Sequence, residues 1–311
     1  MARKKRGKRG ERHLFSGLVL LIAVAAAVIL VVSAMGYAPG LYYGEGTTQR
    51  VENRKNGSSD GRYRPEHRND KSVTASSQPG WQIALYALPL GSDTLYTLIN
   101  EQGRYVVNYD PDTRNARWAA YILTRAEAGV SNAERSNRFT TDTRLSGRGW
   151  AAASTGDYTR SGYDRGHLVP SADRDDNQTE NRATFVMTNI SPQRPGLNRH
   201  VGKNLESRVR KWALEHDSLY IVTAGVLAPT AGRPLKTIGA GVAVPELFFK
   251  AIAVRDGDRF QAIGFVIPNI DDCNRDYRVY AVSPDSVRHL TGLDIFGALP
   301  AEEVYDTGFW F

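Results

Sequence analysis

The chain of 311 residues is long enough for one large domain or two small ones, and its 41% hydrophobic content is ordinary for a globular protein with a buried core. Its single cysteine, Cys273, excludes an intramolecular disulfide and a multi-cysteine zinc site. The formal net charge of +7 fits a polyanionic partner, but the first thirteen residues alone hold seven Lys or Arg against one Glu. Most of the excess positive charge therefore belongs to the N-terminal end.

The N-terminal end carries the signals of a membrane anchor. Residues 15–35 form a nearly unbroken apolar run, about 31 Å long as a helix, which matches the hydrocarbon thickness of a bilayer. The basic residues 1–14 predict a cytoplasmic tail by the positive-inside rule, so we expect a single-pass signal anchor with the bulk of the chain outside the cytoplasm, in a bacterial periplasm or at the cell surface. Cleavage near Ala34, which would give a secreted protein, is the alternative, although the run is long for a signal peptide.

Residues 36–79 predict a flexible linker. They are rich in Gly, Ser, Asn, Arg and Asp and contain few apolar residues, so they cannot bury enough surface to offset the entropy of ordering. The folded domain is expected to span residues 80–311.

Short strands are expected along this domain. Apolar or β-rich runs, several of them bounded by turn signals such as Pro111-Asp112 and Asp256-Gly257, predict antiparallel pairs and a hairpin. The expected strands are Gly103–Tyr109, Trp118–Leu123, Thr184–Ile190, Ser218–Thr223, Phe248–Val254 and Phe260–Ile267.

Two helices are expected in addition. The long one runs from Asn198 to Glu215, with apolar residues every three or four positions, and the second runs from Ser283 to Thr291. Together the elements predict an α+β fold with an antiparallel sheet flanked by helices.

Charge is unevenly distributed within the domain. The segment Arg135–Lys211 holds fourteen Lys or Arg and eight Asp or Glu, a net +6, whereas the rest of the domain is acidic. A basic segment around a site is what a polyanionic substrate requires. Chance clustering on a solvated face is the alternative interpretation.

The basic segment contains a candidate catalytic histidine and a candidate metal site. His167 follows Arg165-Gly166, interpreted as a tight turn, so its ring is expected to be free, with a pKa of about 6.5 that suits a general base. Asn198 opens the long helix, and Glu206 lies two turns further on a similar face. An amide oxygen and a carboxylate are hard ligands of the kind Mg²⁺ accepts. Asp164 and Arg165 are interpreted as an ion pair that stabilises the turn.

The motifs occur in the order and spacing of one family. The chain from about Trp118 onward resembles the DNA/RNA non-specific endonuclease family, which includes secreted bacterial sugar-nonspecific nucleases and mitochondrial endonuclease G. The resemblance implies a ββα-metal (His-Me finger) nuclease fold. The matching segments are Tyr163–Leu168, Ser171–Arg174, Asn189–Gln193, Asn198, Leu205-Glu206 and Thr291–Phe296.

The resemblance also implies roles for the catalytic residues. His167 would be the general base, Asn198 the ligand of one Mg²⁺ or Mn²⁺ ion, and Glu206 the holder of metal-bound water. Arg210 would lie near the scissile phosphate. Asn189 and Gln193 would position the histidine and the metal.

Further arginines are expected to bind or orient the substrate. The family's upstream arginine corresponds to Arg135 or Arg138, and the sequence does not choose between them. The substrate-binding candidates are Arg165, Arg194 and Arg199. One departure from the family is Gly202, where a tryptophan is common, and its absence is expected to loosen helix packing.

The leading functional hypothesis is a membrane-tethered, metal-dependent nuclease that acts on DNA and RNA. A homodimer is a further expectation. One alternative is a nucleic-acid-binding or DNA-uptake module of the same fold with little catalysis. The other is a phosphodiesterase for small nucleotides.

Overall fold

The computed structural model describes residues 88–89, 94–228 and 234–311. The predicted basic tail, signal anchor and linker, residues 1–79, lie outside this part of the chain. Within the part that is described, no helix combines the length and the apolar character needed to cross a membrane.

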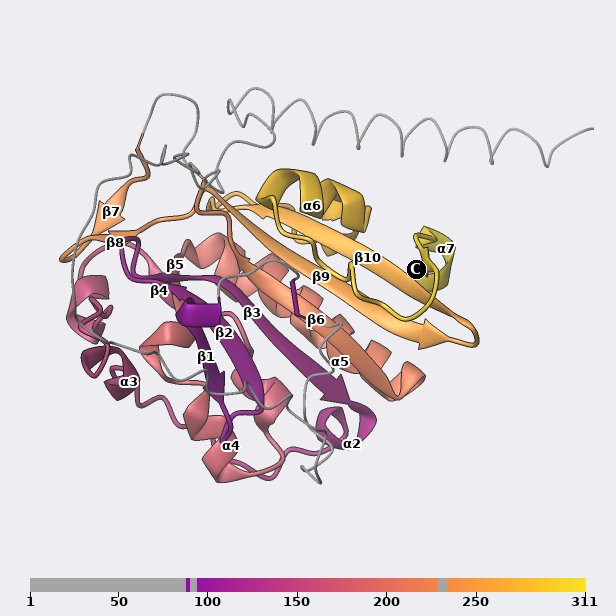
Figure 1. Ribbon diagram of the computed structural model, residues 1–311, viewed down its shortest axis with the longest axis horizontal. Coiled ribbons are helices and arrows are strands. Elements are labelled where there is room, and N and C mark those ends of the chain that lie inside the picture. Colours follow the sequence, from indigo (N-terminus) through magenta and orange to yellow (C-terminus); the bar gives the residue numbers. More distant parts are fainter. Residues whose placement is uncertain (1–87, 90–93, 229–233) are drawn as a thin grey trace, which may run out of the picture.

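The domain is built on one large sheet with the strand order β1-β2-β3-β6-β9-β10-β11, and β12 pairs with β10. All neighbours are antiparallel except β12, which runs parallel to β10. Figure 1 shows the main strands of this sheet, β1, β2, β3, β6, β9 and β10, as a single twisted layer. The strands are β1 (Thr97–Asn100), β2 (Tyr105–Asp110), β3 (Asn115–Thr124), β6 (Ser218–Gly225), β9 (Leu247–Asp256), β10 (Arg259–Pro268), β11 (Ala281–Val282) and β12 (Glu303–Val304).

Helices cover both faces of this sheet. On one face α5 (Lys203–His216) and α7 (Thr307–Trp310) pack Leu205, Trp212 and Trp310 into a core with the strands. On the other face α6 (Pro284–Thr291) buries Val287 in a second core. Because both faces are covered, β9 and β10 are buried along most of their length, without alternation between a buried and an exposed face.

Smaller elements complete the fold, several of them around the site described below. They are η2 (Thr94–Tyr96), α2 (Arg125–Ala128), α3 (Thr143–Ser146), η3 (Thr155–Tyr158), η4 (Ser171–Arg174), α4 (Gln178–Ala183), β7 (Thr237–Ile238), β8 (Val242–Ala243) and η7 (Tyr277–Tyr280).

Most expected elements are confirmed, with the α+β class and the antiparallel sheet. The β9–β10 hairpin turns at Gly257, whose φ of 60° favours glycine, and Ser283 caps α6 by accepting a hydrogen bond from Ser286 N. The strand expected at Thr184–Ile190 is wrong. That segment turns through η5 (Met187–Asn189), and the strand β5 (Ile190–Gln193) begins only where the expected one ends.

The strand β5 pairs antiparallel with β4 (Asp164–His167) in a separate two-stranded sheet. After β5 the chain enters a π-helix, η6 (Leu197–Gly202), which continues directly into α5. The order strand, strand, helix is therefore present, and it places the residues of the motifs beside one another.

Candidate active site

The pairing of β4 with β5 fixes the place of His167. In the register of these two strands Asp164 lies opposite Gln193, Gly166 opposite Ser191 and His167 opposite Ile190. A Cβ atom on Gly166 would lie 2.2 Å from the Gln193 side chain, so only glycine lets Gln193 pack across the hairpin. The expected tight turn at Arg165-Gly166 is wrong, since both residues belong to the strand.

Asn189 fixes the backbone that follows the histidine. Its Oδ1 accepts a hydrogen bond from Val169 N at 2.9 Å, and its Nδ2 donates to Val169 O at 3.0 Å and to Thr184 O at 2.9 Å. The segment before Asn189 forms only one isolated bridge, of Val186 with Thr140, and is therefore not a strand. Asn189 is fully buried and holds the chain on either side of it.

The His167 ring is packed rather than free. Its centroid lies 4.6 Å from that of Phe185 and 5.6 Å from that of Phe139. Its Nε2 atom is buried and has no hydrogen-bond partner among the described residues. Burial, aided by the positive charge of Arg135, lowers the pKa of His167 to about 3. The pKa therefore lies below the value of about 6.5 expected for a free ring, and the ring stays neutral at physiological pH.

Asp164 joins the hairpin to the helix. It accepts hydrogen bonds from Asn198 Nδ2 at 2.9 Å, from Arg199 Nε at 2.8 Å and from Arg199 Nη2 at 2.6 Å. Burial tends to raise the pKa of Asp164, but the bonds from Arg199 and Asn198 outweigh it and hold the pKa below its usual value. Asp164 is thus an anion that positions Asn198.

The expected ion pair between Asp164 and Arg165 is wrong, because successive side chains on a strand point to opposite faces. Arg165 donates instead to Thr155 O at 2.9 Å, and its guanidinium lies 5.5 Å from the centroid of the Phe139 ring.

The orientation of Asn198 follows from this partner. An ionised carboxylate only accepts hydrogen bonds, so the amide nitrogen must face Asp164 and the amide oxygen must point elsewhere. The π-helix around Asn198 also accounts for Gly202, because a Cβ atom there would lie 2.9 Å from Leu197 O. Glycine fits this backbone, where the family often has tryptophan.

A second group of charges lies beside α5. Arg210 donates to Asp173 Oδ1 at 2.9 Å, and Tyr121 donates to Asp173 Oδ2 at 2.8 Å. Burial raises the pKa of Glu206 to about 7, with the charge of Lys250 opposing the rise and that of Asp173 adding to it. Glu206, Arg210 and Asp173 are therefore close enough to influence one another strongly.

Sequence reasoning missed two members of this group. Asp173 is fully buried and anchors Arg210, and Lys250 is a buried cation on β9 whose Nζ lies 5.7 Å from the Tyr121 ring centroid. The signal for Lys250 was present, because it is the only charged residue in the apolar run Phe248–Val254. A lysine placed inside a core strand needs a negative partner.

The arginines divide into two sets. Arg135 hydrogen-bonds Ser171 Oγ, lies 5.1 Å from the Phe185 ring centroid, and its charge acts on both His167 and Glu206. Arg138, which is exposed as Arg135 is, makes no such contact with another described residue. Arg199 is 63% exposed, and Arg194 lies over the Tyr163 ring at 4.7 Å, so these two stand at the rim.

A hairpin that carries a histidine and a following helix that begins with an asparagine define the ββα-metal class of nucleases. The chain belongs to the DNA/RNA non-specific endonuclease family, whose model matches residues 91–302.

Relatives agree with this assignment. The chain is 38% identical over 208 residues to a nuclease of Nostoc sp., covering 64% of this chain and 72% of the relative. It is 30% identical over 222 residues to the mitochondrial endonuclease G of Homo sapiens, covering 68% and 72% of the two chains. A crystal structure of the EndoG/EndoGI complex matches with a TM-score of 0.61 at 29% identity, covering 72% of this chain and 93% of that chain.

Proposed function

We propose that this chain hydrolyses phosphodiester bonds of DNA and RNA with His167 as the general base and Asn198 as the ligand of one Mg²⁺ or Mn²⁺ ion. Membership of a family of divalent-metal-dependent, non-specific nucleases supports the reaction. The observation that carries the residue roles is the bond from Asn198 to Asp164, since it ties the metal ligand to the strand that carries His167.

The residues present fit such an ion. The Asn198 amide oxygen faces away from Asp164, and Glu206 has a carboxyl group whose raised pKa a nearby cation would lower. Among the described residues there is no group of three or more His, Cys, Asp or Glu that could hold a metal. One amide ligand with the rest water suits Mg²⁺, which dehydrates reluctantly. Bound there, the ion would polarise the phosphoryl oxygen and stabilise the leaving oxygen.

The protein's own groups would act on the water and the phosphate. His167 is neutral at physiological pH, so a ring nitrogen that water reaches would take the proton; Nε2 is buried and is not that atom. Arg210, held by Asp173, would place a fixed positive charge at the phosphate, with Arg135 on the histidine side. Glu206 would hold water, while Asn189 and Gln193 keep the hairpin in shape. Arg165, Arg194 and Arg199 would contact the substrate at the rim.

We further propose the topology that the N-terminal sequence favours. Residues 1–14 would lie in the cytoplasm, residues 15–35 would anchor the chain, and residues 36–79 would tether a nuclease domain outside the cytoplasm. A homodimer is a second proposal, which sedimentation of the purified protein would test. Retention of the protein in membranes after alkaline carbonate extraction would support the anchor. Release of the protein into the soluble fraction would oppose it.

Removal of divalent metal is expected to abolish activity. The purified protein should degrade plasmid DNA and RNA in Mg²⁺ or Mn²⁺ and lose this activity in EDTA, with recovery on adding the ion back. The measurement is gel electrophoresis of both polymers and of a dinucleotide. Cleavage of the dinucleotide with both polymers intact would favour the small-nucleotide phosphodiesterase. Binding without any cleavage would favour the non-catalytic module.

The metal requirement is expected to depend on pH. Because the pKa of Glu206 is raised to about 7, this carboxyl is protonated below that pH, and protons then compete with the cation. The Mg²⁺ concentration for half-maximal activity should be about tenfold higher at pH 6 than at pH 8. Glu206→Gln, which cannot titrate, should bind Mg²⁺ weakly. Its Mg²⁺ concentration for half-maximal activity should be the same at both pH values. An unchanged half-saturation in the wild type would contradict the assignment.

A further inference from the structure

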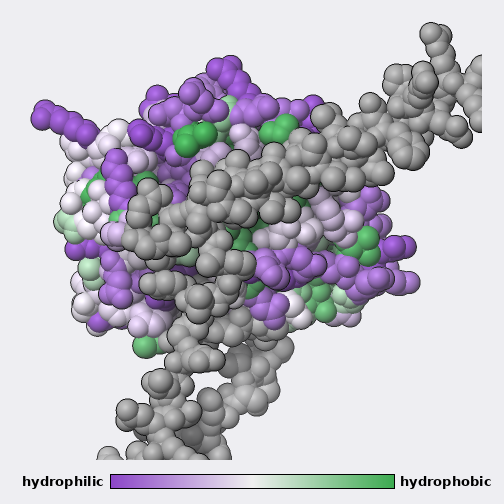
Figure 2. All heavy atoms as spheres, turned by 90° about the horizontal axis from the view of Figure 1, so that it is seen from above, coloured by the Kyte–Doolittle hydropathy of each residue, from purple (hydrophilic) through white to green (hydrophobic). Residues whose placement is uncertain are grey.

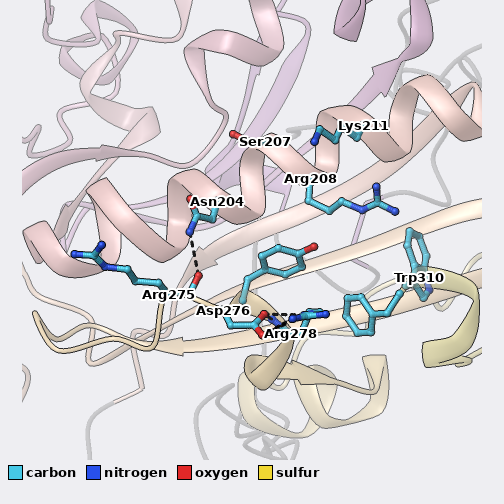
Figure 3. Close-up of a pocket in the computed structure, with 10 residues that line it drawn as sticks. Asn204, Ser207, Arg208, Lys211, Arg275, Asp276, Arg278 and Trp310 are labelled. Carbon is cyan, nitrogen blue, oxygen red and sulfur yellow. Dashed lines mark hydrogen bonds and ion pairs between the residues drawn. The ribbon is translucent and has the colours of Figure 1, made fainter.

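A groove of about 520 Å³ lies on the other flank of α5, between this helix, the segment 275–278 and Trp310-Phe311. Figure 3 shows Arg208 and Lys211 on α5 opposite Arg278 and Trp310, with Arg275 extending along the N-terminal part of the helix. The groove lies outside the site described above and has no role in the proposed chemistry.

The walls of this groove carry net positive charge. Four basic side chains face one acidic side chain, Asp276. Arg278 is neutralised by Asp276 at 2.7 Å, and Arg208 by Glu215 at 3.1 Å. Lys211 and Arg275 are exposed, and neither side chain makes an ion pair or hydrogen bond with another described residue. Two cations are therefore available for an anionic ligand.

Aromatic rings accompany these cations. Phe311 is 47% exposed, and Tyr277 is partly exposed with its ring backed by Trp212 at 6.4 Å between centroids. The rings of Tyr277 and Phe311 lie 6.3 Å apart. Free cations interleaved with accessible rings are the features that hold single-stranded nucleic acid, because phosphates pair with the cations and unpaired bases stack on the rings.

One hydrogen bond on α5 links the groove to the active site. Ser207 lines the groove and accepts a hydrogen bond at 3.3 Å from Arg210, which in turn binds Asp173 in the site. Asn204 donates to Arg275 O at 3.0 Å and so ties the opposite wall to the helix. Ser207 lies three residues before Arg210 and is its neighbour on the helix, about one turn or 5.4 Å away. Lys211 follows Arg210 directly and projects from a different side of the helix, where it lines the groove. A strand that leaves Arg210 past Ser207 therefore enters the groove.

We propose that this groove is a second nucleic-acid subsite, which binds a phosphate and a base of a single-stranded part of the substrate outside the bond that is cut. The proposal rests on the proposed endonuclease function, and it commits to an unpaired strand because a duplex would offer no base face to Tyr277 and Phe311.

The test compares long and short substrates in the full chain. Lys211→Glu and Arg275→Glu should each raise the KM for a 30-nucleotide single strand about tenfold, while kcat/KM for a dinucleotide stays within about twofold of the wild type. A 30-base-pair duplex should be affected less than the single strand. Arg182→Glu is the matched control, because Arg182 is also an exposed arginine and lies on α4, away from α7 in Figure 1.

Binding provides a readout that does not need catalysis. In EDTA, the anisotropy of a fluorescein-labelled 30-nucleotide strand should show about tenfold weaker binding for both variants, and Lys211→Ala should lower the slope of log affinity against log salt by about 1. Binding equal to that of Arg182→Glu would overturn the subsite, as would an equal loss of activity on the dinucleotide. A change of oligomeric state with unchanged DNA binding would overturn it in favour of a protein contact. An inactive wild type whose binding still depends on Lys211 and Arg275 would defeat the endonuclease function and leave the subsite standing.

Discussion

His167→Ala should lower kcat on DNA and on RNA by about 10³-fold or more, because the neutral imidazole is the proposed acceptor of the proton from water. The KM for either polymer should change little, since the arginines that meet the phosphate remain. Initial rates on both polymers at saturating Mg²⁺ measure the effect. His200→Ala is the matched control, because His200 is exposed on the same helical segment as Asn198. A variant that keeps a tenth of the activity would exclude His167 as the general base.

The same variant separates catalysis from packing through its acid stability. The pKa of His167 is about 3 in the folded protein and about 6.5 in the unfolded chain, so between these pH values only the unfolded chain binds the proton. The free energy of unfolding therefore falls as the pH falls through this window. The loss from this one group is up to about 2 kcal/mol between pH 6.5 and pH 5. His167→Ala should lack this component. An identical pH dependence of unfolding in both proteins would contradict the buried, neutral ring.

Local signals in the sequence were sufficient for much of the fold. The hairpin at Gly257 and the helix capped by Ser283 need only turn and cap chemistry, which neighbouring residues supply. The surface is less regular. Figure 2 shows hydrophobic residues in separate groups among hydrophilic ones on the face that it draws. Such a surface has no regular apolar pattern along the chain, so periodicity does not predict the paths of the loops. The segment before Asn189 shows the limit, since it is apolar like a strand but makes only an isolated bridge with Thr140 before it turns through η5.

The motifs identified the site residues without their environment. Spacing along the chain indicated that His167, Asn198 and Glu206 belong together, yet it could not show that Phe139 and Phe185 enclose the histidine. Such contacts join residues far apart in sequence, and burial then shifts the pKa by an amount no motif encodes.

Lys250 illustrates the same point for charges. It lies in the middle of β9, pairs in register with Thr223 on β6, and acts on Glu206 from a strand 44 positions later in the chain. In turn, burial lowers the pKa of Lys250, while Glu206 and Asp173 oppose that shift. The charge balance under α5 is thus set by the sheet as well as by the helix.

Asn198→Ala should reduce activity by about 10²- to 10³-fold, because the amide oxygen is the proposed protein ligand of the ion and such an ion contributes several kcal/mol to the transition state. The half-saturating Mg²⁺ concentration should rise as well. Rates measured across a range of Mg²⁺ concentrations check both effects. Asn132→Ala, at an exposed asparagine outside the site, is the control.

Exchange of the pair Asp164 and Asn198 tests how the ligand is held. In the native protein Asp164 accepts a hydrogen bond at 2.9 Å from the Asn198 amide. Asn198→Asp supplies a stronger metal ligand but places two carboxylates together at this contact. This variant should therefore remain nearly as inactive as Asn198→Ala. The double variant Asp164→Asn/Asn198→Asp restores one donor and one acceptor with their places reversed. It should regain about tenfold or more over Asn198→Asp, in line with the usual effect of groups that orient a metal ligand. If the double variant is no more active than the single one, Asp164 does not act by orienting Asn198, and the link between hairpin and helix has only a structural role.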